Sequence, residues 1–337
     1  MIHHILQRLK SPSSVLAFMF FALTSFSGTA IATTYTVYIH GKASNGGTFT
    51  EGANYHDLSY WAPVDGVSVG GFNQRAINWD GKNRIADTNA AIRDGLDCYC
   101  TGANNCHVVV HSAGNLQLGY ALEKYGSSKR NKFTPPNYNG GAPASACLNA
   151  YDLAASINKI FGFPPPILAD FQQSGWNIKS VTVAAGAAGG SELARPITYP
   201  MAGLNRDLDV ATARSLYDHN KTQGHLFNLY IGANSEVSKL WTDVITDLAT
   251  GAVAALLPGE DDGAVAYHSS AGRKSSGKFC NTGVVWFNPA TWGCTKVATG
   301  KSDAAWTNHS VSNVDTSESY NHNTVKKLVY QAAENFR

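Results

Sequence analysis

The sequence has few charged residues and almost no excess of either sign. Lysine and arginine number 26 against 24 aspartates and glutamates, and the four types together make up 15% of the 337 residues. No basic cluster is dense enough to neutralise a run of phosphates. The composition therefore argues against a nucleic-acid partner, and we expect none.

Apolar runs long enough to cross a bilayer are also missing. The stretch 15–26 follows two cations, Arg8 and Lys10, and is too short and wrongly flanked for a stable membrane span. It leads to Ala30-Ile31-Ala32, which has the small-residue spacing of a signal-peptidase site. We therefore predict a signal peptide over 1–32 and a secreted protein, periplasmic or extracellular. An uncleaved anchor is the alternative.

Cysteine is scarce, with six residues, but its even count in an exported chain predicts disulfide bonds. Cys280 and Cys294 bracket a short segment rich in Trp, Phe and Val, and we pair them. Three pairings are open to the other four, which are Cys98, Cys100, Cys106 and Cys147. No His/Cys pair follows at zinc-ligand spacing, so we expect no metal site.

Against these shortages, 44% of the residues are hydrophobic, enough to bury a large core. Apolar strands alternate with helical patterns, which predicts a mostly parallel central sheet flanked by crossover helices. We expect strands at 35–39, 74–79, 177–185 and 226–231, a further strand before Ser112, and helices at 84–96, 116–125 and 323–336.

The most informative motif is the apolar run from Cys106 that stops at Ser112. It is typical of a nucleophile elbow, in which a buried strand turns sharply into a helix and the serine is strained outward. Gly114 supplies the small residue needed two positions after the serine, whereas Val110 stands where glycine or alanine is usual. Ser112 is the candidate nucleophile, and an ordinary strand end is the alternative.

A nucleophilic serine needs a base, and the base needs an orienting carboxylate. Downstream of Ser112 the chain supplies Asp262 in an acidic turn and then His322, just before the predicted last helix. We choose these two as acid and base. Asp261 and His309 are the nearest substitutes, although His309 stands at the entry to the last strand rather than in the loop beyond it.

Acyl transfer also needs two backbone donors for the developing oxyanion. His40-Gly41 ends the first clear strand, so we expect the N–H groups of Lys42 and Ala113 to form this oxyanion hole. His111, adjacent to the serine, is expected to point away from the pocket or to steady the elbow.

The alternation breaks over 127–176, which we interpret as an insertion after the nucleophile helix, a possible lid or substrate rim. The alternative is a surface excursion packed on its own aromatic residues. Four of its apolar side chains are candidates for binding substrate, namely Phe161, Phe163, Ile167 and Leu168.

Together these motifs resemble those of the bacterial secreted lipases of the α/β-hydrolase family and the related extracellular polyester (polyhydroxyalkanoate) depolymerases. The matching islands are 38–41, 109–114, 181–191, 262–265 with 269–272, and 320–322. The resemblance implies an α/β-hydrolase fold, one catalytic domain over 33–337, and hydrolysis of carboxylic esters (lipid, small ester or polyester) by Ser112, His322 and Asp262 without a cofactor.

Two departures from the family pattern are Val110 and Thr324. The second stands where such lipases often carry an acidic calcium ligand, so a structural calcium site is not expected. Cleavage of amides or peptides would use the same residues and stays open. So does a non-catalytic secreted binding module built on a hydrolase fold.

Overall fold

The computed structural model describes residues 33–42, 58, 60–61, 73–102, 104–131, 172–194, 203–234, 257–273, 278–297, 299–300, 306–317 and 319–334. The chain from Thr34 to Arg337 forms one compact unit. The predicted signal peptide, most of the predicted insertion and five residues singled out above lie outside the described residues, namely Cys147, Phe161, Phe163, Ile167 and Leu168.

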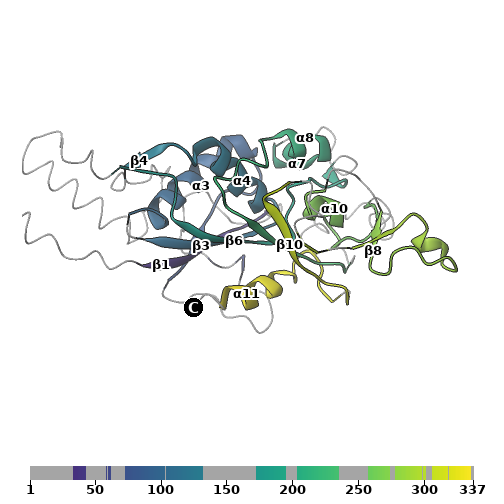
Figure 1. Ribbon diagram of the computed structural model, residues 1–337. Coiled ribbons are helices and arrows are strands. Elements are labelled where there is room, and N and C mark those ends of the chain that lie inside the picture. Colours follow the sequence, from purple (N-terminus) through teal and green to yellow (C-terminus); the bar gives the residue numbers. More distant parts are fainter. Residues whose placement is uncertain are drawn as a thin grey trace, which may run out of the picture. The chain divides into compact units, whose positions relative to one another are not determined.

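A six-stranded sheet of order β10-β7-β6-β3-β1-β2 lies at the centre of this unit (Figure 1). Its strands are β1 (Thr34–Ile39), β2 (Gln74–Ile77), β3 (Asn105–His111), β6 (Ile178–Ala184), β7 (Phe227–Ile231) and β10 (His309–Val314). Every pairing within it is parallel. The predicted fold class, a mostly parallel sheet flanked by helices, is confirmed.

The longer helices are α3 (Ile85–Tyr99), α4 (Gly114–Tyr125) and α11 (Lys326–Glu334). Short helices follow β6 or the acidic turn, namely α7 (Gly203–Leu208), α8 (Val210–Ser215) and α10 (Tyr267–Ser270). Two small sheets pair β4 (Lys129–Asn131) with β5 (Gln172–Ser174) and β8 (Phe279–Cys280) with β9 (Thr295–Lys296). In the part of the chain described, no helix is long and apolar enough to cross a membrane.

Side-chain alternation along the strands builds a core on each face of the sheet. Val108 and Val110 of β3 belong to the larger core, which also contains residues of α3 and α4. Val109 between them belongs to a second core with Val325, which directly precedes α11, and Val329, which lies in that helix. Figure 1 shows α3 and α4 on one side of the sheet and α11 on the other. Because both faces are covered, consecutive residues of a strand can be apolar and buried, as Val108, Val109 and Val110 of β3 are.

Several boundaries of helices and strands differ from the sequence predictions. The strand expected to reach Trp79 ends at Ile77. Helix α3 continues past Leu96 to Tyr99, which is fully buried. The last helix begins three residues beyond Asn323, because the side-chain oxygen of Asn321 accepts hydrogen bonds from the backbone N–H groups of Asn323 and Thr324 and holds a turn there.

Two disulfides join pairs of cysteines within the described residues, and Cys98 is disulfide-bonded as well. Cys280 is bonded to Cys294, the pair suggested by the sequence, and Cys100 is bonded to Cys106. The second bond links the end of α3 to the start of β3, the strand that leads to Ser112. It therefore helps to fix the position of the strand that carries the candidate nucleophile.

Candidate active site

Ser112 lies at the turn between β3 and α4 in a left-handed conformation. Its φ of +54° is rare for a residue other than glycine. Backbone hydrogen bonds hold the turn, since the Ser112 N–H donates to the carbonyl of Ala184 in β6 at 3.0 Å and the Ser112 carbonyl accepts from the Asn115 N–H at 3.0 Å. A strained serine between a buried strand and a helix is the geometry of a nucleophile elbow.

Two glycines allow the backbones to approach closely at this turn. A Cβ on Gly114 would lie 2.5 Å from the carbonyl oxygen of Ile39, and one on Gly41 would lie 2.5 Å from the Cβ of Ser112. Glycine is therefore required at both positions. Val110, the departure noted in the sequence, is fully buried in the larger core, so its side chain is accommodated there.

Asp262 and His322, sixty residues apart, are in direct contact. Nδ1 of His322 lies 2.9 Å from Oδ2 of Asp262. The other carboxylate oxygen, Oδ1, accepts from the backbone N–H groups of Ala264 at 3.0 Å and Val265 at 2.8 Å. Because a carboxylate oxygen accepts, Nδ1 is the donor in this contact, and Nε2 is the ring nitrogen left to act on another group.

The loops carrying these two residues are joined through their backbones as well. The His322 N–H donates to the Asp262 carbonyl at 2.6 Å. Tyr320, two residues before His322 in the chain, donates its N–H to Oδ2 of Asp315 at 2.5 Å, directly after the end of β10. The side chains of Asp262 and His322 are almost fully buried, so the orientation of the imidazole is set by fixed groups rather than by solvent.

His111 links the serine's strand to the histidine loop, a role the sequence did not reveal. Nε2 of His111 lies 2.6 Å from the backbone carbonyl oxygen of His322, and the two imidazole centroids are 4.8 Å apart. Since a carbonyl only accepts, Nε2 is the donor and Nδ1 accepts from the hydroxyl of Tyr60 at 2.5 Å. Burial, assisted by the neighbouring His322 and Lys326, holds the pKa of His111 well below its ordinary value, so the ring is neutral.

Lys326, at the start of α11, extends this network. Its Nζ donates to the backbone carbonyl of Tyr60 at 2.8 Å and lies 4.6 Å from the centroid of the Tyr60 ring. The side chain is fully buried, and burial lowers the pKa of Lys326 to about 7. The position of His111 next to Ser112 was the only sequence signal for this cluster, because nothing in the sequence relates Tyr60 or Lys326 to either residue.

The two substitutes considered for acid and base lie in other surroundings. His309 is buried at the start of β10, where its ring stacks on that of Phe227 at 4.8 Å. Burial lowers the pKa of His309 to about 3.

Oδ1 of Asp261 accepts from the Gly263 N–H at 2.8 Å. Burial, partly opposed by that hydrogen bond and reinforced by nearby carboxylates, raises the pKa of Asp261 to about 7. Asp262, rather than Asp261, contacts the ring of His322.

The surroundings of Ser112 fit the expected oxyanion donors. Gly41 lies against Ser112, which brings the neighbouring Lys42 to the same edge of the sheet. Ala113 is the N-cap residue of α4, and the first N–H groups of a helix have no partner within it. The Lys42 side chain is buried, and burial lowers its pKa. The role of the two N–H groups as donors stays a prediction.

Within the described residues, no group of three or more His, Cys, Asp or Glu side chains is placed to hold a metal ion. Thr324, where the lipase resemblance would place an acidic ligand, is engaged instead with Asn321. Its Oγ1 accepts from the Asn321 N–H at 2.9 Å, and its N–H donates to the Asn321 side chain at 3.0 Å.

A parallel sheet with a strained serine between β3 and α4, followed in chain order by an aspartate and a histidine in contact, defines the α/β-hydrolase class of fold. No protein-family model matches the sequence, and no curated protein matches it.

Among solved structures, the fold is similar to lipases and a carboxyl esterase from bacterial or environmental sources. The mature form of the Bacillus licheniformis lipase BlEst2 is 11% identical with a TM-score of 0.44, over 91% of this chain and 92% of that one. Staphylococcus hyicus lipase is 10% identical with a TM-score of 0.43, over 90% and 95%. The metagenomic carboxyl esterase MGS0156 is 13% identical with a TM-score of 0.40, over 91% and 77%.

Proposed function

We propose that the protein is a secreted serine hydrolase of carboxylic esters that works through an acyl-enzyme. The observation that carries the proposal is the contact between Nδ1 of His322 and Oδ2 of Asp262 at 2.9 Å, on a loop that His111, the residue before the elbow serine, contacts at 2.6 Å. Ser112 is held in a left-handed conformation, with a φ of +54°. Strain of this kind is retained where a backbone turn presents a reactive group.

In the proposed reaction, Nε2 of His322 removes the proton from Oγ of Ser112 as the oxygen attacks the ester carbonyl carbon. The tetrahedral oxyanion is stabilised by the N–H groups of Lys42 and Ala113, each contributing on the order of 3–4 kcal/mol when correctly aimed. His322 then donates its proton to the alkoxide leaving group. Water, activated by the same nitrogen, releases the acid and restores Ser112.

Asp262 stabilises the imidazolium that forms and fixes its tautomer. The backbone N–H groups of Ala264 and Val265 donate to its carboxylate and keep it oriented. No step requires a metal ion or an organic cofactor.

Lipids, small esters and polyesters all present the carbonyl that this chemistry attacks. We propose a lipase-like or polyester substrate, bound by apolar side chains of the predicted insertion, namely Phe161, Phe163, Ile167 and Leu168. Replacing these four by serine is expected to weaken hydrolysis of long-chain or polymeric esters more than that of acetates, which need little apolar binding energy.

Hydrolysis of p-nitrophenyl butyrate by the purified chain tests the proposal. Ser112→Ala and His322→Ala should each lower kcat by roughly 10⁴-fold or more, and the double variant should be no worse than either, because the residues act as a unit. His309→Gln is the matched control and should retain activity. Loss of activity in His309→Gln with full activity in His322→Ala would overturn the base assignment.

A further inference from the structure

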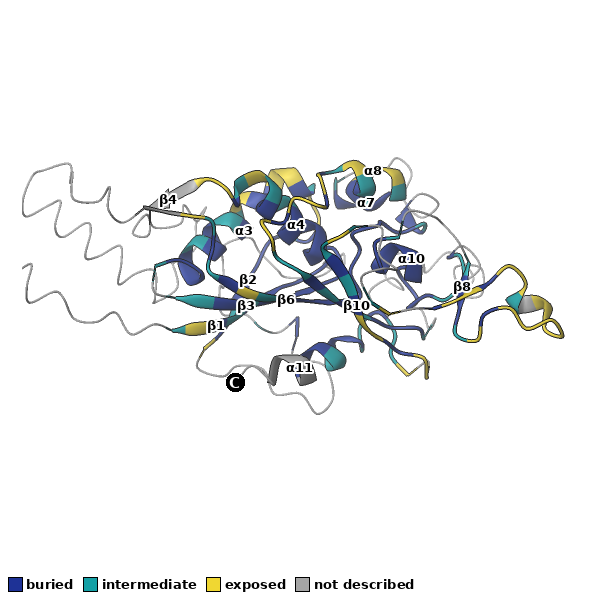
Figure 2. Ribbon diagram, viewed as in Figure 1, coloured by how far each residue is buried: buried dark blue, intermediate teal, exposed yellow. Residues whose placement is uncertain are grey.

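The loop between Cys280 and Cys294 exposes an unusual concentration of apolar side chains. The large hydrophobic residues exposed in the described part of the chain all lie in it: Val284 (45%), Val285 (37%), Trp286 (81%), Phe287 (98%) and Trp292 (58%). Figure 2 shows the segment after β8 as a mostly exposed extension. Exposing two tryptophans and a phenylalanine to water is unfavourable, so a clustered set of this kind marks an interaction surface.

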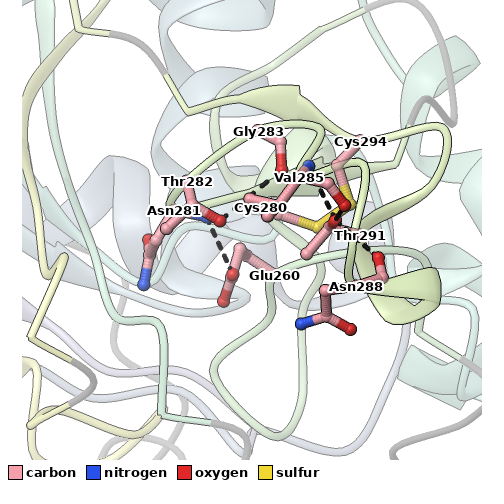
Figure 3. The surroundings of a disulfide bond; sticks show 9 residues. All are labelled: Glu260, Cys280, Asn281, Thr282, Gly283, Val285, Asn288, Thr291 and Cys294. Carbon is pink, nitrogen blue, oxygen red and sulfur yellow. Dashed lines mark hydrogen bonds between the residues drawn. A yellow bond between two sulfur atoms is a disulfide. The ribbon is translucent and has the colours of Figure 1, made fainter.

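The loop is internally braced, as Figure 3 shows around the disulfide. Oγ1 of Thr291 accepts from the Val285 N–H at 2.8 Å and donates to the Val285 carbonyl at 3.0 Å. The indole N–H of Trp292 donates to the Trp286 carbonyl at 3.2 Å. The aromatic side chains are thus presented on an ordered frame, and little ordering entropy remains to be lost when they bind.

The charged residues of the stretch 263–302, which contains the loop, are all cations. From Gly263 to Ser302 the sequence contains no aspartate or glutamate, while its cations are Arg273, Lys274, Lys278, Lys296 and Lys301. Two of these flank the loop directly, since Cys280 of β8 pairs with Lys296 of β9, and Lys278 precedes β8. Lys296 is exposed. The tip of the loop is therefore apolar and uncharged, and its base carries two lysines together with the carboxylate of Glu260.

This layout matches a negatively charged lipid surface. Tryptophan and phenylalanine favour the boundary between headgroups and acyl chains, and lysines near that boundary are attracted to anionic headgroups. A sugar chain would use the aromatic rings but would gain little from the exposed valines Val284 and Val285. We propose that the segment 281–293 docks this protein onto anionic lipid surfaces.

The base of the loop is hydrogen-bonded to the segment that leads to Asp262. The Asn281 N–H donates to Oε1 of Glu260 at 2.9 Å, and the Glu260 N–H donates to the Phe279 carbonyl at 2.5 Å (Figure 3 shows the first). Glu260 precedes the catalytic candidate Asp262 by two residues. A docked surface would therefore lie on the side of the molecule that carries the acidic turn. The consequence that docking favours lipid esters rests on the proposed function, whereas docking itself does not.

Vesicle binding in the Ser112→Ala background tests the docking without hydrolysis of the lipid. The full chain is mixed with vesicles of equal parts phosphatidylglycerol and phosphatidylcholine, and the bound fraction is measured by co-sedimentation and by the blue shift of tryptophan fluorescence. Adding Trp286→Ser and Phe287→Ser together should weaken partitioning by roughly ten-fold or more. Lys278→Gln with Lys296→Gln should weaken it by about five-fold per lysine, and only on the anionic vesicles.

Lys124→Gln, an exposed lysine at the end of α4, is the matched charge control and should bind as the parent does. Unchanged vesicle binding in the Trp286→Ser, Phe287→Ser variant would overturn the proposal. So would gel filtration showing that the same two changes convert a dimer into a monomer, because the loop would then serve self-association. With Ser112 intact, the two loop changes should leave hydrolysis of soluble p-nitrophenyl acetate unchanged. Inactivity of the wild-type chain on that ester rejects the proposed function while leaving the vesicle result standing.

Discussion

Nε2 of His111 donates a hydrogen bond to the backbone carbonyl oxygen of His322 at 2.6 Å. The bond joins the residue before Ser112 to the residue proposed as its base. It fixes the backbone of the histidine loop relative to the end of β3, and the hydroxyl of Tyr60 fixes the tautomer of His111 in turn. His111 is therefore a positioning residue, acting through the main chain of His322.

Replacing His111 by leucine removes this donor while keeping an apolar group of similar size. We expect kcat on p-nitrophenyl butyrate to fall by roughly 10- to 100-fold, because a small displacement of a base is costly, with KM little changed. His111→Gln, which can still donate from its amide, should recover part of the loss. Equal kcat in the leucine variant and the wild type would show that the bond has no positioning role.

Asp262→Asn should lower kcat by roughly 10³- to 10⁴-fold, because an amide cannot hold His322 in the tautomer that leaves Nε2 basic. The neighbouring change Asp261→Asn is the matched control, since Asp261 does not contact the His322 ring. Steady-state kinetics of both variants decides between them. A larger loss of kcat in Asp261→Asn than in Asp262→Asn would show that the catalytic acid is Asp261 and not Asp262.

Asp261 should also make stability depend on pH. Its pKa is raised from 3.8 to about 7, first by burial and then by neighbours that include Asp262, Glu260 and Glu192. A raised carboxyl pKa means that the fold prefers the protonated form, so stability is lost as pH rises from about 4 to about 7. Asp261→Asn should relieve a penalty on the order of 3–4 kcal/mol at pH 8 and almost none at pH 4. Thermal melts at both pH values measure this, and an equal effect at both would contradict it.

Lys326 should make stability depend on pH in the opposite direction, with stability gained as pH rises. Burial lowers its pKa from 10.5 to about 7, so the folded state disfavours the ammonium. The resulting penalty is complete below pH 7 and disappears as pH rises toward 10.5. Lys326→Met should therefore raise Tm more at pH 6.5 than at pH 10, after allowance for the lost hydrogen bond to Tyr60. A Tm difference that grows with pH would show that the burial cost has been misjudged.

Local patterns were sufficient to predict the frame of the molecule. Parallel strands covered on both faces are rich in apolar residues, so β1, β3, β6 and β7 could be located within one or two residues. The short helices α7 and α8 were missed, because six residues carry too little periodicity to be recognised.

The candidate site could be predicted only where chemistry and chain order coincide. Ser112, Asp262 and His322 stand next to turn residues and in the order that a hydrolase uses. The contacts of His111 with Tyr60 and His322 join positions 51 and 211 residues apart, and no local pattern encodes such a contact. The role of Val110 was also out of reach, since its fit depends on the packing of the core around β3.

The central claim is that Ser112 is an activated nucleophile, and covalent labelling tests it most directly. The wild-type chain, with Ser112→Ala and His322→Ala as controls, is treated with a fluorophosphonate probe, and the modified residue is located by mass spectrometry of the digest. We predict stoichiometric labelling of Ser112 in the wild type, none in Ser112→Ala, and strongly slowed labelling in His322→Ala. Absence of labelling at Ser112 in the folded wild-type chain, or equal labelling in His322→Ala, would contradict the account.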